Sequence, residues 1–140
     1  MLITNHVVSG AIIGSVAPGP SSAFVAGLAS HFALDSLPHW GERRIFLQVA
    51  VVDGLVGLAA MGALARLAPA SRRGRVVAGM LGACAPDADK PSTLFFGRSP
   101  YPRVVDDWHI SIQNESPRRL PQEVVVAGLG ALVARRLLRR

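Results

Sequence analysis

His31 and Asp35 combine residue types and a spacing that suggest chemistry. They lie four residues apart in the stretch SHFALDSLPHWGE, residues 30–42. On a helix this spacing places both side chains on one face, one turn apart. Pro38 ends such a helix, because it lacks an N–H and its ring clashes with the preceding turn. His39 then lies in the turn that follows, so the stretch predicts half of a metal site.

The other histidines, and two further aspartates, also lie at or near the ends of expected helices. Helical bundles build metal sites from histidine and carboxylate side chains that project into the interior. Nitrogen and oxygen ligands without a thiolate favour zinc first, then manganese or another divalent ion. The expected metal ligands are His6, His31, Asp35, Asp87 and Asp89. The residues expected to carry protons during catalysis are His39 and His109.

Simpler interpretations of the same residues remain open. His31 and Asp35 can form a buried pair that only satisfies hydrogen bonds. Asp87 and Asp89 can cap a turn. Asp53, in the middle of an apolar segment, is expected to make a polar contact between helices rather than to bind a metal.

The composition favours a membrane protein or a tightly packed helical bundle. Half of the residues are hydrophobic and only 17% are charged, whereas about a quarter are charged in ordinary soluble domains. The mean hydropathy is +0.35. Cys84 is the only cysteine, which excludes a disulfide framework and a cysteine zinc ribbon. No basic leader precedes the first apolar segment, so no cleaved signal peptide is expected.

The net charge of +6 comes almost entirely from arginine. The arginines cluster at the ends of apolar segments, as the positive-inside rule describes for cytoplasmic loops. We therefore expect a protein of the cytoplasmic membrane, in contact with lipid, with its Arg-rich loops and tail on the cytoplasmic side. Nucleic-acid binding is a weaker alternative, because no RNA-binding signature accompanies the charge, and it requires the arginines to share one continuous face.

The expected fold is all-α: a compact, membrane-associated bundle of about five apolar helices in a single domain, residues 1–140. No segment shows convincing β alternation. Gly10 and Gly14 predict a close contact between helices. Only 45–68 is long enough to cross a membrane, since about 20 apolar residues are needed. The expected helices are 7–16, 23–36, 45–68, 75–84 and 122–138, with a shorter one over 104–114. The expected loops and turns are 38–44, 69–74, 86–91, 92–103 and 117–121.

Three segments together resemble the YdjM-like family of membrane-bound metal-dependent hydrolases. They are Thr4-Asn5-His6, the segment from Ser30 to Asp35, and GACAPDAD at residues 82–89. More distantly, His31-x-x-x-Asp35 followed by Pro38 and His39 is similar to a segment of the zinc-dependent phospholipases C and related single-strand nucleases. The order of the two aspartate-containing segments is exchanged relative to the YdjM-like arrangement. The resemblance implies an all-α protein with metal-dependent phosphodiester hydrolysis, and it best supports His6, His31, Asp35 and Asp87.

Two functions follow from these residues. The first is a metal-dependent hydrolase, with zinc as the expected metal, that cleaves phosphoester bonds at the membrane. Its substrate would be a small molecule or a lipid, of lipid or nucleotide type. The alternative is a non-catalytic integral membrane protein in which a structural cluster of histidine and aspartate ties helices together.

Overall fold

The computed structural model describes residues 1–139, and these residues are mostly helical, so the all-α prediction is confirmed. The α-helices are α1 (Ile3–Val16), α2 (Pro20–Asp35), α3 (Phe46–Leu67), α4 (Ala70–Cys84), α5 (Asp89–Phe96), α6 (Arg103–Ser111) and α7 (Leu120–Leu138). Shorter elements are the 3-10 helices η1 (Ala85–Ala88) and η2 (Pro117–Arg119) and the strands β1 (Pro38–His39) and β2 (Asn114–Glu115).

The long helices lie where the sequence predicts them, but α1, α4 and α5 differ in extent. α1 begins at Ile3, four residues before the predicted start at 7. α4 begins at Ala70 and therefore includes the basic segment 70–74 that was predicted to be a turn. α5 forms over residues predicted to be a loop or turn, and it ends at Gly97, whose φ of 72° is the left-handed conformation common after a helix.

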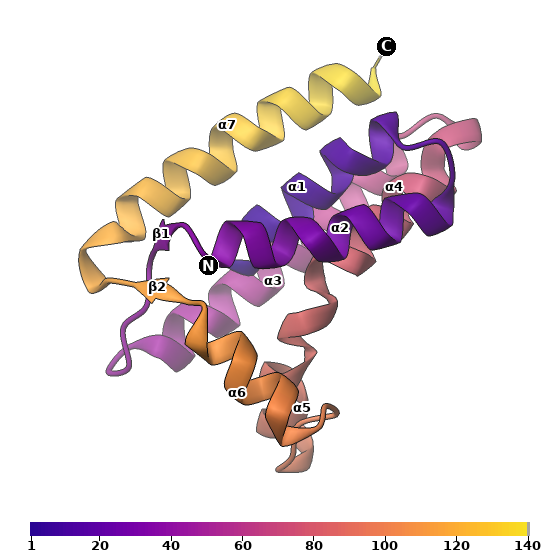
Figure 1. Ribbon diagram of the computed structural model, residues 1–140. Helices are drawn as coiled ribbons and strands as arrows, with labels where there is room; N and C mark the ends of the chain where they lie inside the picture. Colours follow the sequence, from indigo (N-terminus) through magenta and orange to yellow (C-terminus); the bar gives the residue numbers. More distant parts are fainter. Residues whose placement is uncertain (140) are drawn as a thin grey trace.

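The helices α1, α2 and α4 form the centre of the molecule, with α3 and α7 packed on α1 (Figure 1). In Figure 1, α7 crosses the top, and α5 and α6 project from the opposite side as a pair. The buried apolar core joins α1, α3, α4 and α7. Its members are Val7, Ala11, Leu64, Ala68, Val76, Met80, Ala134 and Leu138.

Glycines bring the backbones of α1 and α2 unusually close to α4. A Cβ atom on Gly10 of α1 or Gly27 of α2 would lie within 3.0 Å of the carbonyl oxygen of Gly79 in α4. One turn further along α1, a Cβ on Gly14 would lie 2.5 Å from Cα of Val76. The close contact predicted from Gly10 and Gly14 is therefore confirmed, and it is made with α4.

Two carboxylates from other helices hold the first turn of α1. Asp53 of α3 accepts hydrogen bonds from the backbone N–H groups of Ile3 and Thr4 and from the Thr4 hydroxyl. Glu123 of α7, only 1% exposed, accepts from Leu2 N at 2.9 Å and from Asn5 Nδ2 at 2.8 Å. The first N–H groups of a helix have no partner within it, so these carboxylates replace a local cap. Asp53 thus makes the predicted polar contact between helices.

A small parallel β pairing ties together two connections that are far apart in the sequence. Pro38 pairs with Asn114, and His39 pairs with Glu115. The pairing joins the segment after α2 to the segment after α6, and it fixes one end of the α5–α6 pair against the bundle (Figure 1).

Large apolar side chains are exposed along α3 and α7. α3 has 22 residues and is long and apolar enough to cross a membrane. Only 11% of its most apolar 18-residue stretch is buried within the protein. Its length of about 33 Å, at about 1.5 Å per residue, matches a hydrocarbon core of about 30 Å. The exposed apolar residues of α7 are Val124, Val125, Val126, Leu129, Leu132 and Val133.

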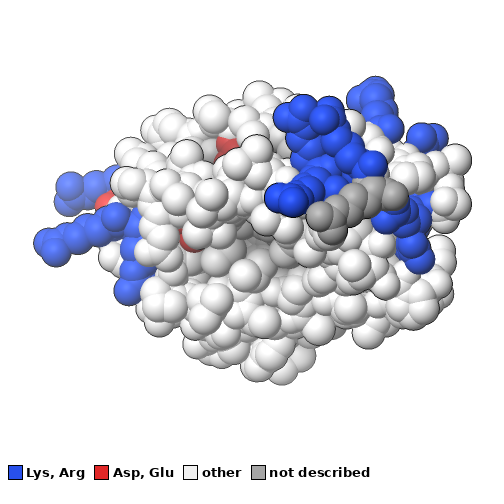
Figure 2. Space-filling view, turned by 90° about the horizontal axis from the view of Figure 1, so that it is seen from above, with Lys and Arg blue, Asp and Glu red and all other residues white. Residues whose placement is uncertain are grey.

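The basic side chains do not form one continuous patch on the face seen in Figure 2. Lysine and arginine gather at two opposite ends of this face, and the surface between them is almost free of charge. A nucleic-acid interface through the arginines requires one shared face, so this separation gives that alternative no support.

Replacing Gly79 by alanine should lower the stability of the bundle. The new methyl group would press on the backbone of α1 at Gly10 and Gly14, and overpacking of this kind costs about 1–3 kcal/mol. Gly74 is the matched control in the same helix, because a Cβ there meets nothing within 4 Å. We expect G74A to be neutral or stabilising by up to about 1 kcal/mol. Thermal unfolding in detergent, followed by circular dichroism, should show a lower Tm for G79A alone; equal Tm values would contradict the packing described above.

Candidate metal centre

α2 delivers His31 and Asp35 to the bundle interior from its last turn and a half. Both side chains are fully buried, and His31 Nε2 lies 3.1 Å from Asp35 Oδ2. The other ring nitrogen of His31, Nδ1, donates a hydrogen bond of 2.7 Å to the carbonyl oxygen of Ala83, near the end of α4. The predicted one-turn spacing on one helix face is confirmed, and the carbonyl fixes the orientation of the imidazole.

Three further side chains converge on this pair from three other elements. His109 of α6 places its Nε2 2.9 Å from Asp35 Oδ2 and 3.0 Å from His31 Nε2. His6 of α1 places its Nε2 3.2 Å from Asp35 Oδ1, and its ring stacks on His31 with centroids 4.0 Å apart. Asp87 of η1 reaches within 3.9 Å of His6 Nε2. The amino group of Met1 also lies 3.1 Å from Asp35 Oδ1.

This buried group could hold a metal ion. His31, Asp35, Asp87 and His109 each offer one ligand atom, and these four atoms lie within 4.8 Å of one another. Ligands at about 2.0–2.2 Å from a zinc ion lie about 3.0–3.5 Å from one another, depending on the coordination geometry. The separations of 2.9–3.1 Å among the His31, Asp35 and His109 atoms are already close to that range.

The hydrogen bonding of His31 requires either a proton or a cation between its Nε2 and Asp35. Its Nδ1 must carry a hydrogen, because the carbonyl of Ala83 can only accept. In the neutral imidazole, Nε2 then presents a lone pair to the carboxylate oxygen of Asp35, 3.1 Å away. Two electron-rich atoms at this distance repel each other unless a proton or a cation lies between them. A divalent ion bound between His31 Nε2 and Asp35 Oδ2 would remove this repulsion, so the arrangement of these ligand atoms fits a divalent ion.

The electrostatics keep Asp35 ionised and His6 neutral. Burial raises the pKa of Asp35, but hydrogen bonds with His109, His31 and His6 outweigh it and hold that pKa far below its usual range. Burial lowers the pKa of His6 more strongly than the neighbouring Asp35 raises it. Among the described residues, neither ring nitrogen of His6 has a hydrogen-bond partner of suitable geometry. An ionised carboxylate and a neutral imidazole are the forms that bind metals.

Two residues predicted to belong to the site lie outside this group. His39 is buried, but β1 holds it by the strand pairing, and its Nδ1 bonds to the carbonyl oxygen of Leu37. Asp89 begins α5 and pairs with Lys90 at 2.7 Å. Lys90 lies near both carboxylates, 3.8 Å from Asp87 and 2.7 Å from Asp89. Asp87 is the one of the two that also approaches a histidine, at 3.9 Å from His6 Nε2.

Cys84 borders the group but does not enlarge its set of ligands. Burial, with the negative charges of Asp87 and Asp53, raises the pKa of the Cys84 thiol to about 12. A thiol that keeps its proton at neutral pH is a poor zinc ligand, which agrees with the sequence-based expectation of nitrogen and oxygen ligands alone.

Some residues that build the site are not among the site residues predicted from the sequence. The carbonyl of Ala83 orients His31, and backbone groups carry no mark in the sequence. Glu123, which fixes the helix turn carrying His6, could have been noticed as a lone carboxylate at the start of an apolar helix. The Tyr101 hydroxyl donates to the carbonyl of Ala85. This contact could not have been noticed, because nothing in the sequence links Tyr101 to the end of α4.

Comparison with known proteins identifies no relative. No family model, no curated protein and no solved structure matches this chain.

Asp87 and Asp89 provide a matched test of the cluster. After reconstitution with zinc and removal of free metal, we expect D87N to bind zinc at least about tenfold more weakly than wild type, because changes at a metal site typically weaken metal binding by about 10–100-fold. D89N should bind like wild type, because its carboxylate pairs with Lys90 instead of facing the histidines. Elemental analysis of the purified proteins measures this directly. Equal loss of zinc in both variants would contradict the placement of the two aspartates.

Proposed function

We propose that this protein is a membrane-associated, metal-dependent hydrolase of phosphoester bonds, with zinc as the first candidate metal. The observation that carries the proposal is the convergence of His31, Asp35, Asp87 and His109 from α2, η1 and α6 into one largely buried group. A structural pair of His31 and Asp35 would need only each other and the backbone. The approach of His6 and Asp87 to that pair instead supports a binding site.

Three residues would hold the ion: His31 through Nε2, and Asp35 and Asp87 through their carboxylates. Three protein ligands leave coordination positions open, as in catalytic zinc sites. When bound, the ion supplies Lewis acidity for a phosphoryl oxygen and lowers the pKa of a coordinated water. His6 stacks on His31 and fills the space behind it.

His109 is the residue we assign to proton transfer. Its Nε2 lies 2.9 Å from Asp35 Oδ2, and this contact orients the ring. His109 also lines a cavity beside the cluster, so a substrate there would meet it directly. His39, the other predicted proton carrier, bonds to Leu37 and lies outside the cluster, so it has no part in this proposal.

Hydrolysis of bis(p-nitrophenyl) phosphate by the zinc-loaded protein tests the proposed activity. We expect H109Q to lower kcat by about 10²–10⁴-fold, the usual contribution of general acid–base catalysis. Its zinc content should stay close to that of wild type, because the three proposed ligands, His31, Asp35 and Asp87, remain. The control is D107N, whose side chain is 67% exposed and pairs only with Arg103. Absence of hydrolysis by zinc- and manganese-loaded wild type would refute the activity.

The proposed membrane association rests on α3 crossing the bilayer, and two exposed leucines test it. Leu55 lies in the middle of α3 and is 65% exposed, whereas Leu37 lies outside the helix and is 53% exposed. Aspartate at the centre of a spanning helix costs about 2.5–3.5 kcal/mol of insertion free energy. We expect L55D to reduce the fraction of protein in carbonate-washed membranes and L37D to leave it unchanged. Equal recovery of both variants would show that α3 does not face lipid.

A further inference from the structure

An apolar cavity of about 410 Å³ lies beside the metal cluster, between α2 and α6. Phe24, Leu28 and Phe32 form one wall, because their four-residue spacing places them on one face of α2. Val105 and His109 of α6, also four residues apart, form the facing wall. The volume falls within the range of about 300–1,000 Å³ that is usual for small-molecule sites.

The inner end of this cavity is the cluster itself. Phe32 packs edge-on against His109, with ring centroids 5.7 Å apart, and against His31 at 5.4 Å. The same His109 reaches Asp35 through Nε2. A molecule in the cavity would therefore end within reach of the proposed ligands.

The polar groups in the cavity wall are already engaged. The Tyr101 hydroxyl donates to the carbonyl of Ala85, and Asp106 accepts a hydrogen bond of 3.1 Å from the Ser99 hydroxyl. Apart from the second oxygen of Asp106 and the ring of His109, what remains is hydrocarbon and aromatic surface, which offers few donors or acceptors to a sugar or a nucleobase. The mouth is apolar as well, since Phe24 and Val105 are 39% and 40% exposed there.

We propose that this cavity holds the hydrocarbon chain of an amphiphilic phosphoester, with the phosphoester group at the cluster. The placement of that group rests on the proposed function, whereas the binding of the chain does not. The assignment narrows the substrate class to amphiphiles with an apolar chain and excludes nucleotide-type substrates. An exposed apolar mouth also suits a substrate that arrives from a membrane.

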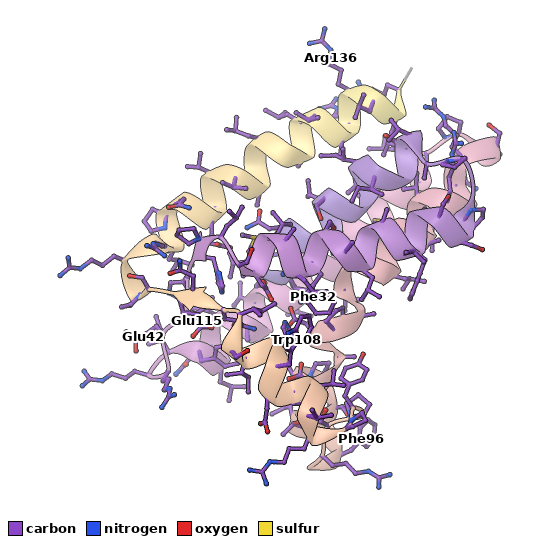
Figure 3. The ribbon with its side chains drawn as sticks, in the orientation of Figure 1. Phe32, Glu42, Phe96, Trp108, Glu115 and Arg136 are labelled. Carbon is purple, nitrogen blue, oxygen red and sulfur yellow. The ribbon has the colours of Figure 1, made fainter. Side chains whose placement is uncertain are left out.

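Trp108 provides a reporter at this site. Its ring packs against Phe32 with centroids 4.7 Å apart, and Figure 3 shows the two side chains together where α2 meets α6. The chain has only two tryptophans. W40F therefore leaves Trp108 as the sole source of tryptophan fluorescence.

The probes are 11,12-dibromododecyl phosphate and 3-bromopropyl phosphate, whose bromine atoms quench nearby tryptophan. In W40F protein in detergent, we expect saturable quenching by the long-chain probe at a concentration at least about tenfold lower than for the short one, because its chain buries more apolar surface. Adding V105F, which narrows the cavity, should raise the concentration of the long-chain probe needed for half-maximal quenching at least about fivefold. V104F is the control, because Val104 is 74% exposed and does not line the cavity.

L28F narrows the cavity from the opposite wall and should reproduce the V105F result, which guards against misfolding of one variant. Equal quenching in V105F, L28F and V104F, or equal potency of the two probes, would overturn the proposal. Zinc content, measured on the same samples, separates the two claims. Chain-dependent quenching in a protein that binds no zinc would refute the hydrolase while still supporting the cavity assignment.

Discussion

The close contact of α1 and α2 with Gly79 of α4 is the constraint on which the site depends. α1 carries His6, α2 carries His31 and Asp35, and η1 continues directly from α4 to carry Asp87. Their side chains meet only if the three backbones approach more closely than any Cβ at the contact would allow. The lack of side chains at Gly10, Gly14, Gly27 and Gly79 thus sets the spacing of the polar atoms at the end of the bundle.

Buried carboxylates in this apolar chain each have a distinct set of partners. Asp35 is surrounded by three imidazoles, whereas Asp53 and Glu123 accept hydrogen bonds from the first turn of α1. A buried charge is stable only when it is paired or hydrogen-bonded. Asp53 and Glu123 meet N–H groups that can only donate, whereas Asp35 faces imidazole nitrogens that can carry a proton or bind a metal ion. This difference separates the proposed site from the structural contacts around it.

The sequence predicts the helices and half of the site, for reasons that can be stated. Proline and glycine positions and the apolar segments define the long helices, and the four-residue spacing of His31 and Asp35 is a local property of one helix. The approach of His109 depends on the α5–α6 pair, which was partly expected to be a loop. The divergence of Asp87 and Asp89 depends on a 3-10 turn that the motif does not reveal. Long-range placement, not residue type, limits the sequence-based prediction.

The bonds from Glu123 to Leu2 and Asn5 connect residues that are about 120 positions apart in the chain. During synthesis, α1 leaves the ribosome long before α7 does. Until α7 arrives, the first turn of α1 lacks one of its two carboxylate partners, and His6 lies in that turn. The histidine translated first is thus among the last to be fixed in position, so a nascent chain interrupted before α7 leaves the proposed metal site incomplete.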